Sequence, residues 1–542
     1  MGTSSVHGDD ALAQWFLLAE QRGNPATRID RRHVDGRAWT EGNLVEALVH
    51  GARYFARLHD CLSELAAGDR VYFTDWRGDP GQRLRGPGTE LAPFLGSLTR
   101  RGIAVRGLVW RSHPDQGKFS EQENQELGKV VNEAGGEVLM DERVRRAGCH
   151  HQKLVLLHHL EHPDDDVAFV GGIDLCHGRA DDEHHHGDPQ AIVLDKRYGP
   201  RPAWHDVQLE IRGPAVGDIA ETFRERWEDP TPLDHKNPWR ARLARLGRGP
   251  RRARPLPPMP ADPGAVGSLA VQVVRTYPAK RPPFPFAPQG ERSVARAYMK
   301  ALRRARSLIY LEDQYLWSDE ISGVLAAALE RSPELRLIAV VPRFPDSDGL
   351  LSGPPNRIGQ QAALKRLREA GGERVAFYDL ENDQGLPIYV HAKVCVVDDV
   401  WATVGSDNLN RRSWTHDSEL SCAVLDSRRD ARSPTDPGGM GDGARVFARE
   451  LRLELWREHL GRDAADAHLL DPAQGFETWR RLALGRDAWH GGGRKGPPPP
   501  GRVRVHVTEP VRPWTARWAA PAYRILIDPD GRPTKLKRAR HF

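Results

Sequence analysis

The sequence predicts an α/β protein made of two similar lobes with mixed sheets. Apolar runs typical of buried strands alternate with amphipathic segments of helical spacing along both halves of the 542 residues, an order that favours sheets with largely parallel pairing. A short pattern of histidine, lysine and glycine also occurs twice, first at 151 and again at 391. Because a chain of this length exceeds the usual limit of a single core, we interpret the halves as related units.

The first half opens with apolar residues near helical spacing, among them Leu44, Leu48, Tyr54 and Phe55, which predict one amphipathic helix over 41–66. Apolar runs bounded by glycine, proline and charged residues predict the strands that follow. The later elements of this half are expected as strands at 69–76, 103–110, 152–157, 167–170 and 206–212, and as helices at 89–101 and 215–228.

The second half repeats this order of elements. Its helices are predicted at 292–305, 320–331, 359–370 and 443–460, and its strands at 307–312, 335–341, 374–378, 394–397, 401–404 and 418–425. A segment rich in proline, glycine and arginine separates the halves and is typical of a linker. We therefore expect a first lobe at 1–230, a linker at 231–266, a second lobe at 267–465 and a C-terminal extension at 466–542.

Composition indicates a soluble globular protein. The net charge is +5, and its arginines are dispersed, which favours anionic partners only weakly. The five cysteines form neither a CxxC pair nor a disulfide framework, which is typical of a reducing compartment. No signal peptide is recognised, and no run approaches the roughly 20 apolar residues of a membrane span. We expect a cytoplasmic monomer whose contact with membranes, if any, is peripheral.

A histidine and a lysine stand two residues apart in both copies of the pattern, at His151 and Lys153 and again at His391 and Lys393. Residues two apart on a strand point to the same face. If the two faces meet, two imidazoles and two ammonium groups surround one small volume. This set suits an anionic phosphodiester, because one imidazole can attack, the other can donate a proton, and the lysines can balance charge.

The second copy has the form HxKxxxxD followed by GSxN, the HKD motif, and in this it resembles the phospholipase D superfamily, with the lipid-cleaving and bacterial branches most similar. The resemblance implies two α/β lobes related by pseudo-twofold symmetry, with the active site at their seam. It also implies two successive displacements through a phosphohistidine, with no metal and no cofactor. On the usual family assignment, His151 is the nucleophile and His391 the acid that protonates the leaving alcohol, while Lys153 and Lys393 neutralise the phosphoryl oxygens.

The loops after each motif supply further expected site residues. Ser406 and Asn408, in the loop Gly405-Ser-Asp-Asn408, are expected to donate hydrogen bonds to the phosphate. Gly172 and Asp174 occupy the corresponding loop of the first half, where a buried aspartate is expected to hold the loop rather than bind phosphate. The last two expected site residues are Asp206, which follows the first motif on a later strand, and Glu419, which follows the second in the same way. Each is expected to orient a catalytic imidazole.

The first copy departs from the family pattern at one position. Asp398 stands five residues after Lys393, but His158 stands five residues after Lys153. Asp398 belongs to the family's catalytic motif, and we expect it to brace the active-site strand. On that interpretation His158 can replace the acid and the enzyme stays active. A separate tract, His184-His-His186, is interpreted as a solvated loop rather than a metal site.

The leading functional hypothesis is a phospholipase D-type phosphodiesterase that acts on glycerophospholipids and releases phosphatidic acid and the head-group alcohol, with water or another alcohol as acceptor. Cardiolipin-synthase-like phosphatidyl transfer is one alternative. A nuclease of the same superfamily is another, although no basic, aromatic-lined groove is evident and no nucleic-acid partner is expected. The alternative of a different class is an inactive scaffold that binds phosphate or lipid, and His158 is its only support.

Overall fold

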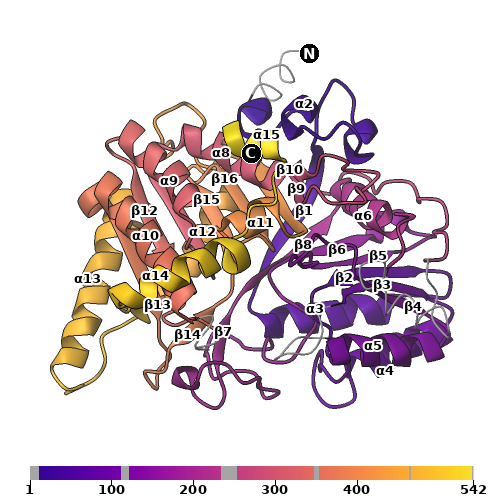
Figure 1. The fold of residues 1–542 in the computed structure, drawn as a ribbon, viewed down its shortest axis with the longest axis horizontal. Helices are drawn as coiled ribbons and strands as arrows, with labels where there is room; N and C mark the ends of the chain where they lie inside the picture. Colours follow the sequence, from indigo (N-terminus) through magenta and orange to yellow (C-terminus); the bar gives the residue numbers. More distant parts are fainter. Residues whose placement is uncertain (1–10, 112–120, 234–252, 347–352, 463–465, 540) are drawn as a thin grey trace.

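The structure, a computed structural model, describes residues 11–111, 121–233, 253–346, 353–462, 466–539 and 541–542. One mixed sheet runs through the whole molecule, and most of the helices lie against its two faces (Figure 1). Of the predicted linker, residues 234–252 lie outside the described chain. Among the residues described, none of the helices combines the length and apolar character that crossing a bilayer requires.

The first half of the sheet has seven strands whose spatial order differs from their order in the chain. From the centre of the molecule outward they are β1 (Thr40–Val49), β8 (Val207–Arg212), β6 (Val167–Gly171), β5 (Leu154–His158), β2 (Arg70–Asp75), β3 (Ala104–Trp110) and β4 (Glu137–Asp141). The pairs β2–β3 and β3–β4 are parallel, whereas β5 pairs antiparallel with both of its neighbours. The predicted mixed sheet is therefore confirmed, but the expectation of largely parallel pairing is wrong, because the other four pairings of this half are antiparallel.

The second half repeats that order from the centre in the opposite direction. Its strands are β9 (Leu269–Tyr277), β17 (Glu419–Asp426), β16 (Trp401–Gly405), β15 (Lys393–Val397), β11 (Leu308–Asp313), β12 (Arg336–Val340) and β13 (Val375–Leu380), followed by β18 (Val503–Val505). The central strands β1 and β9 pair antiparallel and join the halves. Each of the seven strands in the first half thus has one counterpart in the second half. This correspondence gives the pseudo-twofold relation between the lobes.

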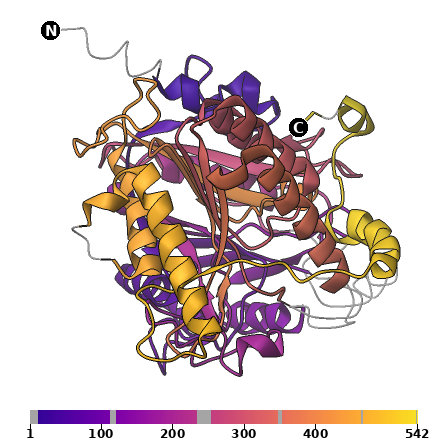
Figure 2. The same ribbon diagram turned by 90° about the vertical axis from the view of Figure 1, so that its left-hand side faces the viewer.

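Helices cover both faces of the sheet in each half. One face of the first half carries α3 (Gly51–Glu64), α4 (Leu91–Arg100) and α5 (Glu121–Glu133), and the equivalent face of the second carries α8 (Ser293–Arg304), α9 (Asp319–Arg331) and α10 (Gly353–Gly371). The opposite faces share one core with α6 (Ala215–Trp227), α12 (Val446–Leu460) and α13 (Pro472–Gly491). Figure 2 shows the second-half strands between two helical layers.

The two motif strands, β5 and β15, are buried on both faces. In β5, Leu154 and Leu156 belong to the core shared by both halves, whereas Val155 and Leu157 face the core under α3–α5. The residues of β15 alternate in the same way between the shared core and the core under α8–α10. This double burial explains the continuous apolar runs. The motif lysines mark the start of these apolar runs: Lys153 directly precedes β5, and Lys393 is the first residue of β15.

The prediction of one helix over 41–66 is wrong. The segment forms strand β1 and then helix α3, and His50 between them has a φ of 70°. Leu44 is 48% exposed, so it takes no part in the apolar face that the helical spacing implied. The sequence misled because Leu44 and Leu48 happen to continue the helical spacing of α3, whereas β1 is fixed by pairing with β8, more than 150 residues away.

Both ends of the chain pack onto the second half. Trp15, Phe16 and Trp39 lie in the core under α8 and α9. At the other end, β18 pairs with β13, and Trp479 of α13 lies in the shared core. The predicted domain boundaries remain a prediction, and these contacts indicate that the segment before β1 contributes to the second lobe.

Candidate active site

Short parallel pairings between the halves bring the two motifs together. Strand β7 (Ala203–His205) pairs with β14 (Ile388–Val390), and His150 forms the equivalent parallel bridge with Ser418. As a result, the backbone N–H of His391 donates to the carbonyl of His205 at 2.8 Å, and that of His151 donates to the carbonyl of Ser418 at 2.9 Å. Each motif histidine is therefore held by backbone from the opposite half.

The side chains cross the seam in the same way. His391 Nδ1 lies 2.6 Å from Asp206 Oδ2, and His151 Nδ1 lies 2.8 Å from Glu419 Oε2. A carboxylate at Nδ1 fixes the tautomer and leaves Nε2 available for chemistry. The pairing expected for Asp206 and Glu419 is thus present geometrically, but each acid serves the histidine of the other half.

The two lysines have different surroundings. Lys153 forms an ion pair with Asp174 at 3.0 Å, and although burial disfavours its charge, Asp174, Asp75 and Glu419 together raise the pKa of Lys153. Lys393 donates to Gln314 Oε1 at 3.2 Å and to the carbonyl of His391. Burial lowers the pKa of Lys393 to about 8. The site therefore has one firmly charged ammonium and one that titrates just above neutrality.

Asp174 is the point at which both motifs converge. Burial opposes its ionisation, but Lys153, Arg179 and the imidazoles of His391 and His151 outweigh burial and hold the pKa of Asp174 well below its usual range. Arg179 lies 3.4 Å from Asp174. Contacts link the two motifs through this carboxylate: Asp174 pairs with Lys153 and Arg179, and Arg179 stacks on Trp204, whose ring lies beside His391.

His391 is more enclosed than His151. Its side chain is 6% exposed against 15% for His151, and its ring lies 4.9 Å from the ring of Trp204. Burial, followed by Lys393 and Arg179, lowers the pKa of His391 well below its usual value. The imidazole of His391 therefore gives up its proton more readily than an ordinary histidine does.

The remaining predicted loop residues take different positions. The hydroxyl of Ser406 donates to Glu419 Oε2 at 2.6 Å, so it supports the acid behind His151. Asn408 is buried, and its Oδ1 has no hydrogen-bond partner within the described chain. At Gly172, a Cβ atom would lie 2.2 Å from Asp206 Oδ1. Glycine is thus required there by the close approach of the acid that holds His391.

Asp398 lies at the opposite end of β15 from Lys393. Its carboxylate accepts hydrogen bonds from the backbone N–H groups of Arg306, Ser307 and Leu308, each at 2.8 Å. In the first half, His158 instead contacts Asp166 at 2.5 Å. The structure places neither Asp398 nor His158 among the residues that meet at the seam, so the expected bracing role agrees with where Asp398 lies.

Sequence analysis missed four residues beside the motifs. Arg179 stacks on Trp204 at 3.8 Å and contacts Asp174. The other three stand where a strand ends: Asp75 is the last residue of β2, Asp313 is the last residue of β11, and Gln314 follows it. Asp75 accepts from the N–H of Leu175, and Asp313 from that of Leu409, both at 2.8 Å. A usable signal was the aspartate at the end of corresponding apolar strands in each half, whereas Arg179 had none.

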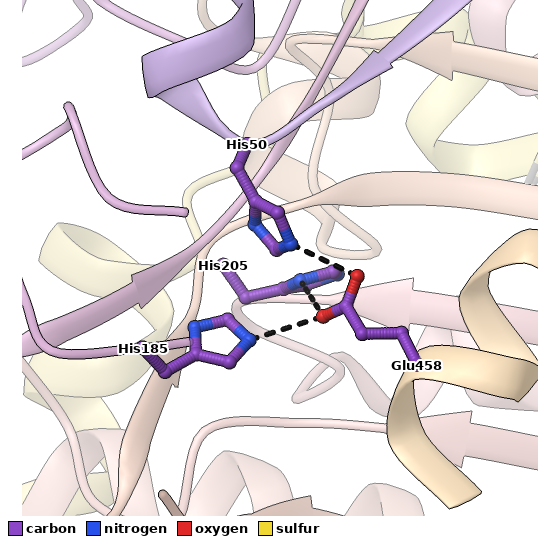
Figure 3. Close-up of side chains that lie close together, drawn as sticks. All are labelled: His50, His185, His205 and Glu458. Atoms are coloured by element: carbon purple, nitrogen blue, oxygen red, sulfur yellow. Dashed lines mark hydrogen bonds and ion pairs between the residues drawn. The ribbon is translucent and has the colours of Figure 1, made fainter. Parts of the chain in front are cut away.

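A second polar cluster lies behind this site. His185, the central residue of the His184–His186 tract, is fully buried and contacts Glu458 at 3.0 Å, together with His50 and His205 (Figure 3). The interpretation of the tract as a solvated loop is therefore wrong for His185. It holds for His184, whose side chain is 65% exposed. Long-range folding, which spacing along the chain does not reveal, brings the acidic partner to His185.

Comparison with known proteins agrees with this geometry. Residues 115–246 match the family model described as phospholipase D, and residues 298–432 match the one described as cardiolipin synthase, PLD-like domain. The chain is 25% identical to phospholipase D alpha 1 of Cynara cardunculus, over 82% of this chain and 69% of that protein. It belongs to the phospholipase D superfamily. Each matched region contains one of the two histidine–lysine motifs, so the predicted family is confirmed.

The chain covers a different share of each relative's length. Phospholipase D alpha 2 of Oryza sativa subsp. japonica is 28% identical, over 72% of this chain and 62% of that protein. The chain thus spans between three fifths and seven tenths of these plant proteins. Among solved structures, phosphatidylserine synthase of Haemophilus influenzae Rd KW20 aligns with a TM-score of 0.47 and 14% identity, over 71% of this chain and 82% of that one.

Proposed function

We propose that the chain is a phospholipase D-type phosphodiesterase that acts on glycerophospholipids and releases phosphatidic acid and the head-group alcohol. One observation carries the proposal: two histidines from different halves share one site, and each has Nδ1 held by a carboxylate. That arrangement provides a nucleophile and an acid on opposite sides of one phosphorus atom. The phospholipase D name of the matched family and relatives supports the substrate class.

The proposed reaction has two displacements. Nε2 of His151 attacks phosphorus, the bond from phosphorus to the head-group oxygen breaks, and that oxygen takes the proton from Nε2 of His391. Water or a primary alcohol then gives its proton to His391 and attacks phosphorus, and the phosphorus–nitrogen bond breaks. Glu419 and Asp206 stabilise the imidazolium that forms at each stage, as the acid of a catalytic triad does.

Charge balance follows from the cations around Asp174. Lys153, Lys393 and Arg179 would face the non-bridging phosphoryl oxygens, where negative charge accumulates in the transition state. A bound phosphodiester would also offset the cations that keep His391 neutral, so it would raise the pKa of that imidazole. We therefore propose that substrate binding takes up a proton and that His391 becomes an acid only in the complex.

Phosphatidyl transfer to an alcohol is the second candidate. It is favoured by one observation, the match of residues 298–432 to the cardiolipin synthase, PLD-like model. Hydrolysis and transfer would share the same phosphohistidine and differ only in the acceptor of the second step. A competing primary alcohol added to the vesicle assay distinguishes the two outcomes, because only transfer yields the phosphatidyl product of that alcohol.

The test measures release of choline and ethanolamine from vesicles of phosphatidylcholine and phosphatidylethanolamine, with plasmid DNA assayed in parallel. We expect head-group release, no DNA cleavage, and at least a roughly 10³-fold loss in His151→Ala. His184→Ala, which changes an exposed histidine, serves as the matched control and should keep full activity. Cleaved DNA with intact lipid would overturn the substrate class. Vesicle binding without turnover of either substrate would support the inactive scaffold instead.

A further inference from the structure

Three histidines and one glutamate converge in a buried cluster behind the catalytic histidines (Figure 3). Glu458 Oε2 lies 2.9 Å from His50 Nε2, and Glu458 Oε1 lies 3.0 Å from His185 Nε2 and 3.7 Å from His205 Nδ1. One donor atom from each residue lies within 4.8 Å of all the others. This is the residue set and the spacing from which divalent metal sites are built.

The four residues come from four separate segments. His50 lies in the turn between β1 and α3, His185 in the loop before β7, His205 at the end of β7, and Glu458 in the last turn of α12. Three belong to the first half and one to the second. All three histidines are buried, and the side chain of Glu458 is 13% exposed. The cluster is therefore a closed site across the seam, with one exposed edge.

The hydrogen bond of His205 to Glu312 leaves the other nitrogen of its ring, Nδ1, beside Glu458. His205 Nε2 lies 2.6 Å from Glu312 Oε2, so Nε2 carries the proton and donates it to this carboxylate. In a neutral ring, Nδ1 then presents a lone pair to Glu458 Oε1, at a distance too long for a hydrogen bond. Two electron-rich atoms would face each other across this gap, and a positive ion between them satisfies both.

His459 repeats this arrangement beside His205. Its Nε2 lies 2.8 Å from Glu312 Oε1, and its Nδ1 lies 3.9 Å from Glu458 Oε1. Neither His205 Nδ1 nor His459 Nδ1 has a hydrogen-bond partner in the part of the chain that the structure describes. Fully buried polar atoms of this kind are rarely left unpaired. Both lie near the same oxygen, Glu458 Oε1, at 3.7 and 3.9 Å, where a cation would lie.

The surroundings also resemble the outer shell of a metal site. Histidines that bind metals usually donate their second nitrogen to a carboxylate, which fixes the ring and strengthens the ligand. Glu312 does this for His205, and Asp181 lies 3.7 Å from Nδ1 of His185. Glu312 also accepts from His459 and, at 2.5 Å, from the Tyr310 hydroxyl, so it is saturated as a supporting group.

We propose that His50, His185, His205 and Glu458 bind one Zn²⁺ ion in a four-coordinate structural site. Imidazole nitrogens and a carboxylate oxygen suit this ion, at distances of about 2.0–2.2 Å. The three histidine nitrogens already lie 2.9–3.7 Å from Glu458 oxygens, so only small side-chain rotations are needed to reach these distances from one ion. Glu312, outside the ligand set, balances the positive charge that remains.

The ion would link the two halves directly behind the catalytic pair. The N–H of His50 donates to the carbonyl of Asp206 at 2.9 Å, and the carbonyl of His205 accepts from His391. Two of the ligands are thus bonded through their backbone to the acid–histidine pair of the site. The structural role follows from this position: the ion fixes Asp206 and His391 relative to each other.

A proton is the competing occupant of the gap. Burial opposes protonation, but Glu312 and Glu458 outweigh it and raise the pKa of His205 to about 10 in the absence of an ion. A protonated cluster would bind no metal and would need none to fold. The two accounts therefore differ in metal content, which can be measured on the full-length protein.

The test is metal analysis of the purified protein, followed by removal of metal with a chelator and titration with Zn²⁺ and with Co²⁺ as a spectroscopic probe. We expect one Zn²⁺ per chain, a Co²⁺ spectrum of a four-coordinate site, and a higher melting temperature with Zn²⁺. His185→Gln and Glu458→Gln should lower the affinity at least 100-fold. Glu312→Gln should lower it roughly 10–100-fold, as loss of an outer-shell partner does.

Two controls locate the ion. His184→Gln changes the exposed neighbour of His185 and should bind Zn²⁺ as the unaltered protein does. His151→Ala should also keep its metal, because that histidine belongs to the catalytic site. Metal loss in His151→Ala, equal affinity in His185→Gln, or a folded protein that binds neither ion would each overturn the proposal. Should the ligand variants fail to fold, X-ray absorption of the Zn²⁺-loaded protein decides: fewer than three imidazoles, or any sulfur ligand, would contradict it.

Discussion

At the scale of single residues, the main feature is the exchange of acids between the halves. His391 is oriented by Asp206 of the first half, and His151 by Glu419 of the second. These partners are 185 and 268 residues apart in the chain. Neither motif histidine is therefore paired with a carboxylate of its own half, although each half contains its own histidine–lysine motif.

This exchange predicts which double variants are additive. Asp206→Asn should lower kcat roughly 10²–10⁴-fold, because the amide no longer favours the required tautomer and charge of His391. The double variants are compared in a His391→Ala background, where the burst of product from a p-nitrophenyl phosphodiester is measured. In this background Asp206→Asn should lower the burst rate little further, whereas Glu419→Gln should lower it by nearly its full effect. The reverse pattern, with Glu419→Gln silent in that background, would show that each acid serves its own half.

A second prediction at this scale concerns pH. Lys393 has a pKa of about 8 because it is buried, so its ammonium is present below that pH and is lost above it. Lys153, whose pKa is raised, stays charged. Sulfate, which keeps its charge over this range, should bind up to about tenfold more weakly for each pH unit above 8. Lys393→Gln should remove this pH dependence. Lys153→Gln should weaken sulfate binding but leave its pH dependence in place. Calorimetry that finds an unchanged slope in Lys393→Gln would contradict the assignment.

Residue type and order along the chain predict candidate site residues within each half, but they do not predict contacts across the seam. The histidine–lysine pairs, the two glycine-rich loops and the later acids were all recognised from residue type and order along the chain. Which acid meets which histidine was not predictable, because strand pairing between the halves decides it. Arg179 and the buried partners of His185 were missed for the same reason.

At the scale of elements, both motif strands are anchored at the end away from the chemistry, but by different groups. The beginning of β11 is held by three N–H bonds to Asp398, which follows β15. In the first half, Asp166 supports the end of β5 by accepting from His158 and, at 2.6 Å, from the N–H of His159. A carboxylate is thus present in both halves. In the second half it belongs to the motif position, Asp398, whereas in the first half, where His158 stands at that position, it belongs to Asp166.

Asp398→Ala should therefore reduce stability and leave the chemistry intact. Three backbone donors lose their partner, which costs about 1–3 kcal/mol where the groups stay buried. The free energy of unfolding from urea denaturation should fall by that amount, and kcat at a temperature where the variant is folded should stay within about twofold. Asp383→Ala, at a side chain 76% exposed, is the control and should change neither quantity. A large loss of kcat in folded Asp398→Ala would assign Asp398 to the reaction.

The error at 41–66 shows the limit of periodicity at this scale. Leu44 and Leu48 fit a helical repeat with the residues of α3, yet they lie on a strand that pairs with β8 on one side and β9 on the other. Local spacing does not reveal this strand pairing, since the pairing partners lie far away in the chain. The buried strands β5 and β15 were predictable because continuous apolar runs have few other solutions.

At the scale of the whole molecule, the two lobes behave as one structural unit. The sheet is continuous through the pairing of β1 with β9, and one core contains Leu156 of β5 together with Val396 of β15. The segment before β1 packs into the second half, and the acids of the site cross the seam. Pseudo-symmetry of the fold therefore does not imply independent stability of its halves.

This continuity predicts a single unfolding transition whose midpoint responds to damage in either half. Leu156→Ala removes a fully buried side chain of the first half and should cost about 2–5 kcal/mol. Calorimetry should show one peak shifted to lower temperature, and hydrogen exchange should accelerate in β15 as much as in β5, because both open only when the shared core does. Leu484→Ala, at a residue 52% exposed on α13, should leave both measurements unchanged. Two separate peaks, of which only one moves in Leu156→Ala, would mean that the lobes unfold independently and that the seam, with its crossed acids, is the weaker contact.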